Sequence, residues 1–176
     1  MPSSPYDAKG LLISSIRDPD PVIFFEPKRV YRAFREEVPE DEYTIPIGKA
    51  RVVCEGTELT IVSWGASVLQ CMESIEKSSR SIELIDLRTI FPMDLEAIEA
   101  SVRKTGRCVV VHEAPRTGGM GAEVAAQIME RCFLYLEAPV QRVTGFDTIM
   151  PYYKLELSYM PDANRISGAI EDVFSF

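Results

Sequence analysis

The stretch from Val109 to Arg131, VVVHEAPRTGGMGAEVAAQIMER, holds the side chains best suited to do chemistry. It contains the only histidine of the chain, His112, followed directly by Glu113 and then by a cluster of glycines. A histidine–glutamate pair can transfer protons, and a glycine-rich turn at a helix start can hold a phosphate. Neighbouring residues of a strand point to opposite faces, so His112 and Glu113 cannot form one catalytic pair with each other.

The glycine cluster matches nucleotide-binding fingerprints only in part. Gly119 and Gly121 fit the first two positions of G-x-G-x-x-G, but the third position is Val124, and no P-loop Lys-Ser pair follows. Free N–H groups at a helix start there can still hold an anion. The alternative is that the glycines only permit a tight turn from strand to helix.

His112 is predicted near the carboxyl end of a strand, where open α/β sheets place their ligands. The more common role is structural, in which the ring satisfies a backbone carbonyl at the edge of the domain. Arg116 and Thr117 in the same loop are candidates for an interface. No serine or cysteine is visibly paired with a base, so nucleophilic catalysis is not predicted.

Asp18 and Asp20, in SSIRDPDP, form another candidate site. Two carboxylates beside the free carbonyls of a helix end can bind a hard cation; the alternative is a solvated Asp-Pro turn. Zinc is not expected, because the four cysteines are widely spaced, none forms C-x-x-C, and only one histidine is present.

The composition excludes several classes of protein. The chain has 176 residues, 46% of them hydrophobic, which is enough for one core. Its net charge of −8 argues against binding nucleic acid or an anionic membrane, although a basic protein partner suits it. No signal peptide or membrane-spanning run is recognisable, and a reduced, cytoplasmic protein is expected.

The first 44 residues are expected to form a helix, a short strand and an ordered linker. Ser4 can cap the helix, Pro5 suits its first position, and Asp7 completes an S-x-x-D capping box. VIFFE, residues 22–26, is predicted to be a strand. A helix and one strand do not make a domain, so we expect them to be the last elements of a folded unit that begins earlier.

From about residue 51 strands alternate with helices, which predicts an α/β fold with a mostly parallel sheet covered on both faces. Asp94 is expected to cap one of the helices and Gly106 to end it. The expected strands are 51–56, 58–65, 81–88, 107–114 and 140–145, and the expected helices are 66–79, 93–106, 121–136 and 162–174.

Several long segments resemble one family. They include DPDPVIFFEPKRVYR, IDLRTIFPMD, SVRKTGRCVVVHEAPRTGGMGAE and LEAPVQRVTGFDT. The chain is similar to the beta subunit of the thiamine-diphosphate-dependent 2-oxoacid dehydrogenase component, over the back half of that subunit. The resemblance implies that residues 1–44 are the end of a pyrimidine-binding domain plus a linker. It implies that residues 45–176 are a three-layer α/β/α domain of the transketolase C-terminal type.

The resemblance also implies a function. The intact enzyme would decarboxylate a 2-oxoacid oxidatively on thiamine diphosphate and magnesium, and transfer the acyl group to lipoamide. The residues that contact this cofactor lie upstream or in the alpha subunit, so no catalytic or cofactor-binding residue is expected here and the fragment alone should be inactive. The sequence HEAPRTGG favours the branched-chain type. The alternatives are the pyruvate type, another enzyme of the transketolase group, and a stand-alone anion-binding interaction module.

The resemblance finally implies partners and sites. The partners are an alpha subunit and a second beta subunit, in an α₂β₂ tetramer, and the lipoyl acyltransferase core. Ser15, Asp18 and Asp20 would bind a structural potassium ion. Glu137 and the terminal carboxylate of Phe176 would bind arginines of the acyltransferase core. His112 and Arg116 are expected at a subunit or domain interface.

Overall fold

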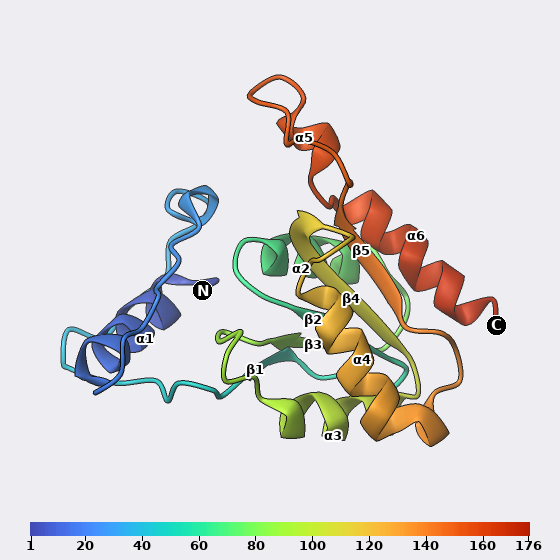
Figure 1. Cartoon of the computed structure of the whole chain (residues 1–176), viewed down its shortest axis with the longest axis horizontal. Coiled ribbons are helices and arrows are strands. Elements are labelled where there is room, and N and C mark those ends of the chain that lie inside the picture. Colours follow the sequence, from blue (N-terminus) through green and yellow to red (C-terminus); the bar gives the residue numbers. More distant parts are fainter.

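The structure is a computed structural model that describes all 176 residues. Its centre is a five-stranded sheet in the order β1-β3-β2-β4-β5 (Figure 1). Three neighbouring pairs are parallel, and β1 runs antiparallel to β3 at one edge. The strands are β1 (Arg51–Cys54), β2 (Leu59–Ser63), β3 (Ile82–Asp86), β4 (Cys108–Pro115) and β5 (Gln141–Gly145). The expected α/β fold with a mostly parallel sheet is confirmed.

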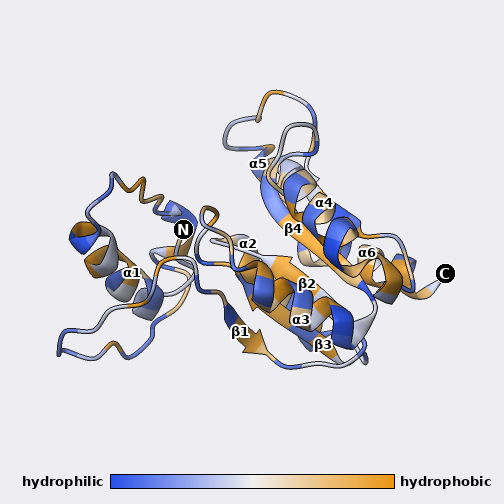
Figure 2. Cartoon of the chain, turned by 60° about the horizontal axis from the view of Figure 1, so that its bottom comes forward, coloured by the Kyte–Doolittle hydropathy of each residue, from blue (hydrophilic) through white to orange (hydrophobic).

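Helices cover both faces of the sheet. One face packs against α2 and α6, and the other against α3 and α4, as the two hydrophobic clusters show. Alternate residues of one strand supply both layers, so that Ile61 belongs to the first cluster and Val62 to the second. In Figure 2 the strands are mainly hydrophobic and the outer helix faces hydrophilic. The helices are α2 (Ser67–Glu76), α3 (Leu95–Thr105), α4 (Gly121–Cys132) and α6 (Ala163–Phe174).

The predicted helix ends of α3 are confirmed. The Asp94 side chain accepts a hydrogen bond from the N–H of Ala97 at 3.3 Å. Gly106 ends the helix with φ 71°, a left-handed conformation that glycine adopts without steric cost. Asp162 caps α6 in the same way as Asp94 caps α3.

The N-terminal segment forms a helix but not a strand. Helix α1 (Pro5–Arg17) follows its cap Ser4, whose hydroxyl accepts the N–H of Asp7 as expected. The second half of the predicted capping box does not form, because the Asp7 carboxylate pairs with Arg88 instead. Residues 22–26, predicted to be a strand, are extended without a partner strand, and Ile23 is 79% exposed. The linker that follows contains only one short 3-10 helix, η1 (Lys28–Val30).

Two further features were not predicted from the sequence. Strands β1 and β2 are joined by a short turn, but they do not pair, because β1 pairs with β3. Residues 146–160 protrude from the sheet and contain a short helix, α5 (Glu156–Tyr159), that was not predicted (Figure 1). The helical stretch of α4 continues into a 3-10 turn, η2 (Phe133–Tyr135). None of the helices combines the length and apolar character needed to cross a membrane.

Candidate functional site

The carboxyl edge of the sheet is the natural place for a site in this topology. The chain runs from β2 through α2 to β3 on one side, and then crosses through α3 to β4 on the other side of β2. Ligands of open α/β sheets bind at such a switch point, outside the carboxyl ends of the strands. His112 lies in β4 near this point, as the sequence predicted.

The His112 side chain is buried without a hydrogen bond. It is 1% exposed, and its ring stacks on Trp64 with centroids 5.3 Å apart and an angle of 10° between the planes. Neither ring nitrogen has a hydrogen-bond partner in the chain. The prediction that the ring satisfies a backbone carbonyl is therefore wrong: stacking holds the ring instead. Burial and then the charge of Arg142 lower the pKa of His112 to about 4, so the ring is neutral at pH 7.

The side chain of Glu113 contacts other residues than the side chain of His112 does. Its carboxylate lies 3.7 Å from the guanidinium of Arg29 in the linker. Burial raises the pKa of Glu113, Arg29 opposes this shift, and Glu156 adds to it. The alternation of side chains along β4 thus separates the histidine from the glutamate.

The switch point is covered by the chain itself. Gly65, two residues after the end of β2, has φ 60°, and a Cβ atom there would lie 3.3 Å from Cγ of Pro27. The linker thus crosses the carboxyl edge at Pro27 and is fixed beside it by the Arg29–Glu113 pair. The crevice in which related topologies bind ligands is occupied by the protein's own N-terminal part.

The loop between β4 and α4 is held by two sets of polar contacts. Arg116 and Arg142 exchange hydrogen bonds, each guanidinium donating to the other's carbonyl, at 2.9 and 3.1 Å. Asp147 accepts the N–H and the hydroxyl of Thr117 at 2.8 and 2.7 Å. These bonds of Thr117 lower the pKa of Asp147. The loop is thereby tied to β5 and to the residues that follow it.

A buried charge network joins α1 to the carboxyl end of β3. Asp7 is fully buried, and its carboxylate lies 2.6 Å from Arg88 and 3.7 Å from Arg51. The hydroxyl of Ser3 donates to Asp86, which also accepts the N–H of Arg88 at 3.0 Å. Sequence reasoning missed this network. The S-x-x-D motif indicated only a capping role for Asp7, and no local signal in the sequence links it to Arg88, 81 positions away.

The three residues proposed for potassium lie at the end of α1. The hydroxyl of Ser15 donates to the carbonyl of Leu11 at 2.8 Å, which leaves its lone pairs free. One oxygen of Asp18 accepts the N–H of Asp20 at 3.0 Å, and the Asp20 side chain is exposed. Oxygen donors suited to a hard cation are therefore present at this helix end, and the potassium site stays a prediction.

One of the two carboxylates proposed for docking, that of Glu137, is paired with an arginine that also contacts the last helix. Glu137 is paired with Arg107 at 2.5 Å, with 58% of the Glu137 side chain exposed. The guanidinium of Arg107 also lies over the ring of Phe174, 4.8 Å from its centroid. Phe174 is two residues before Phe176. Phe176 itself is 73% exposed. Through Arg107, Glu137 thus lies near the end of α6, although the two are distant in sequence.

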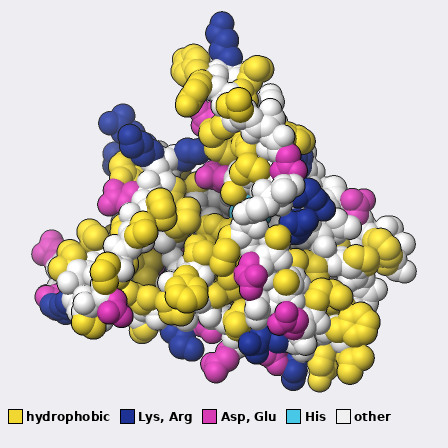
Figure 3. Space-filling model, in the orientation of Figure 1, with side chains coloured by type: hydrophobic (Ala, Val, Ile, Leu, Met, Phe, Trp, Pro, Cys, Tyr) yellow, Lys and Arg dark blue, Asp and Glu magenta, His cyan; other side chains and the backbone are white.

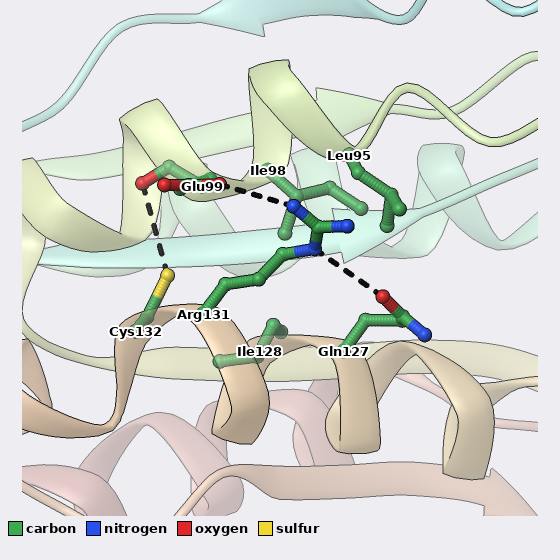
Figure 4. A pocket seen from close by; sticks show the side chains of 7 residues that line it. All are labelled: Leu95, Ile98, Glu99, Gln127, Ile128, Arg131 and Cys132. Carbon is green, nitrogen blue, oxygen red and sulfur yellow. Dashed lines mark hydrogen bonds and ion pairs between the residues drawn. The ribbon is translucent and has the colours of Figure 1, made fainter.

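Two hollows lie away from the switch point. One, of about 270 Å³, is polar and lies between the linker, α2 and the start of α6, with residues of both charges, Arg29, Glu73, Lys77 and Asp162. The other is a seam between α3 and α4 (Figure 4). Arg131 crosses it to Glu99, at 3.6 Å, over apolar side chains of both helices, and it encloses no space for a water molecule. Neither hollow brings a nucleophile and a base together.

Exposed hydrophobic side chains gather on the protruding segment and on the N-terminal part (Figure 3). On the segment 146–157, Ile149, Tyr152 and Tyr153 are each 87–90% exposed. Single exposed apolar residues are common, whereas a continuous group of them is unusual on a folded chain. The four cysteines are free, and three of them are buried.

The chain matches known proteins over its whole length. Residues 48–166 match the family described as transketolase, C-terminal domain. The chain is 54% identical to the 2-oxoisovalerate dehydrogenase subunit beta 2, mitochondrial, of Arabidopsis thaliana, covering 100% of this chain and 50% of that protein. It is 52% identical to a pyruvate dehydrogenase E1 component subunit beta of Staphylococcus aureus, covering 100% of this chain and 55% of that protein.

A solved structure shares the fold. It is a split gene transketolase, in the form of an inactive beta4 tetramer, with a TM-score of 0.66 and 26% identity. The likeness covers 80% of this chain and 46% of the other. The chain spans about half the length of the curated relatives it matches.

Proposed function

We propose a function from one premise: the chain belongs to the transketolase C-terminal domain family. It would be the C-terminal part of a 2-oxoacid dehydrogenase beta subunit. The observation that carries the proposal is identity of 52–54%, continuous over the whole chain, to beta subunits of two such enzymes. The intact enzyme would oxidatively decarboxylate a 2-oxoacid and transfer the acyl group to lipoamide.

We further propose the branched-chain type, with 3-methyl-2-oxobutanoate as substrate. The support is the loop sequence HEAPRTGG, which resembles that branch. The pyruvate type is the alternative, because identity to the two kinds of beta subunit differs by only two percentage points, 54% against 52%.

This part of the enzyme would contribute structure and contacts rather than chemistry. Thiamine diphosphate stabilises the carbanion formed on decarboxylation when it is bound. Pro27 of the linker and the stacked Trp64 and His112 lie at the switch point of this chain, and this part of the chain is not proposed to hold that cofactor. The cofactor and its magnesium would be held upstream and by the alpha subunit.

We propose that residues 1–44 end a pyrimidine-binding domain and that residues 45–176 form the second domain. The support is the nature of the contact: α1 itself contributes no residue to the two hydrophobic clusters and reaches the sheet through the charge network of Asp7 and Arg88, while Met1 before the helix packs against the second cluster. Expression of residues 45–176 alone tests the boundary. A cooperative unfolding transition supports it, and an unfolded product contradicts it.

The activity is tested by assembling the beta subunit that contains this chain with its alpha subunit. Reduction of a dye acceptor is measured with 3-methyl-2-oxobutanoate and with pyruvate, with and without thiamine diphosphate. The proposal predicts a cofactor-dependent reaction with a higher kcat/KM for 3-methyl-2-oxobutanoate. A preference for pyruvate identifies the alternative type, and no turnover with any 2-oxoacid overturns the proposal.

The docking surface is tested separately. Exposed carboxylates that meet arginines give fast, salt-sensitive association. Glu137→Gln in the assembled enzyme should therefore weaken binding to the subunit-binding domain of the acyltransferase and reduce the salt dependence. Glu96→Gln is the matched control. It removes the same charge at a different place, since the Glu96 side chain on α3 is 92% exposed. Equal weakening by both variants contradicts a site at Glu137.

A further inference from the structure

The first turn of α4 carries backbone N–H groups that the chain itself does not use. No side chain caps this helix, whereas Ser4, Asp94 and Asp162 cap α1, α3 and α6. The N–H groups of Gly121 and Glu123 have no acceptor in the loop before the helix. α4 is 12 residues long and has a dipole whose positive end is at its N-terminus. Because α4 follows β4, this end lies at the carboxyl edge of the sheet.

A second, independent feature points to the same place. The His112 ring faces the start of α4, because a Cβ atom on Gly121 would overlap Nε2 and one on Gly119 would lie 2.7 Å from Cε1. The ring is 1% exposed, and neither of its nitrogens has a hydrogen-bond partner. A buried polar group without a partner costs free energy, so this ring has a hydrogen bond to offer to a ligand at the helix start.

Two arginines lie on the same side of the sheet. Arg142 is paired in register with Val110, and Cγ1 of Val110 would lie 3.3 Å from a Cβ atom on Gly121. Arg142 is therefore beside the first turn of α4, which agrees with its effect on the pKa of His112. Arg116 is held against it by the exchanged carbonyl bonds. Each guanidinium uses one N–H there, and neither forms an ion pair with a carboxylate.

We propose that the start of α4, together with Arg116, Arg142 and His112, forms a binding site for a phosphate group. The ligand is free phosphate or a small phosphate monoester. Backbone N–H groups, guanidinium forks and an imidazole offer more donors than the two oxygens of a carboxylate can use. A phosphate brings three acceptor oxygens and nearly two negative charges. The site is independent of the proposed enzyme activity.

The carboxylate of Asp147 lies close to this site and provides a further test of it. Asp147 accepts both the N–H and the hydroxyl of Thr117, which fixes the loop before the helix without using the N–H groups of α4. Its charge also acts on Arg116. Asp147 therefore orders the loop but repels an anion, and Asp147→Asn, which keeps one acceptor oxygen, should tighten phosphate binding.

The test is an NMR titration of the 176-residue chain. Inorganic phosphate and phosphoserine are added in separate experiments, with sodium chloride at equal ionic strength as reference. We expect saturable shifts of the amide signals of Gly121 and Glu123, and of the ring nitrogens of His112. The stronger ligand of the two shows whether the site prefers the free ion or a monoester.

Variants decide whether the named residues form the site. Arg142→Gln should weaken phosphate binding about tenfold, the effect of losing a charge-assisted hydrogen bond. Arg35→Gln is the matched control, because Arg35 is exposed in the linker and should leave binding unchanged. Near-UV circular dichroism checks that each variant is folded. Shifts that chloride reproduces, or equal binding by the two variants, overturn the proposal.

Discussion

The carboxylate of Asp7 lies 2.6 Å from the guanidinium of Arg88, although the two residues are 81 positions apart in the chain. Asp7 is fully buried and the Arg88 side chain is 13% exposed. A buried charge is tolerated only when it is paired, so each residue requires the other. The pair fastens the N-terminal helix to the sheet.

Asp7→Asn should therefore destabilise the chain. It removes the carboxylate that directly pairs with the buried guanidinium of Arg88, and breaking a buried pair costs roughly 3 kcal/mol. Urea unfolding measures the loss. Glu42→Gln removes the exposed partner of Arg17 and should cost less than about 1 kcal/mol. If both variants lose the same free energy, the Asp7–Arg88 pair does not fasten the helix.

Asp86 should make stability depend on pH. Burial raises its pKa from 3.8 to about 6, against the bonds from Ser3 and Arg88. The folded state then binds the proton more tightly than the unfolded chain, so stability falls as the pH rises through this interval and levels off above it.

Asp86→Asn removes this dependence, since the amide does not titrate. The stability of the variant relative to the original chain should rise by roughly 2 kcal/mol between pH 4 and pH 7. Urea unfolding at several pH values measures both proteins, and the other titrating groups cancel in the difference. Parallel curves would contradict a raised pKa for Asp86.

Two glycine-to-alanine changes should change the stability of the chain in opposite directions. Gly121→Ala places a methyl group on the buried His112 ring and should cost roughly 2 kcal/mol. Gly168→Ala places it on an exposed position inside α6, where nothing lies within 4 Å, and should stabilise by about 0.5–1 kcal/mol. Thermal unfolding compares them. A stable Gly121→Ala protein would show that the His112 ring is not held against α4.

The cysteines should differ in reactivity. Burial raises the pKa of Cys71 to about 12 and also raises that of Cys108. Cys54 is only partly buried. Because the thiolate is the reactive form, iodoacetamide at pH 8 should modify Cys54 first in the folded chain, and all four after unfolding. Mass spectrometry of peptides checks the order, and early labelling of Cys71 would contradict the packing around it.

The sequence predicted the regular part of the fold because its signals there are local. Strand β4 begins with a continuous apolar run from Cys108 to Val111, and Asp94 and Gly106 mark the helix ends by their own conformational preferences. The prediction of a strand at residues 22–26 was wrong, because this segment has the composition of a strand but no neighbouring strand to pair with. The pairing of β1 with β3 rather than β2 is likewise set by distant contacts.

The candidate site was predictable in part, and for the same reason. The position of His112 near the carboxyl edge follows from the strand pattern. Its missing hydrogen bond does not, because that depends on which groups of Trp64 and α4 surround the ring. The charge network of Asp7 was also out of reach, since its partner is in another element.

The strand order has a consequence for the synthesis of the chain. Strand β2 lies at the centre of the sheet, yet it is made before both of its neighbours, β3 and β4. Until the ribosome has released Cys108–Pro115, one edge of β2 has no hydrogen-bonding partner. Unpaired strand edges attract other chains. A nascent chain that stalls before Cys108 therefore displays an adhesive edge, and a chaperone is most useful to it at that length.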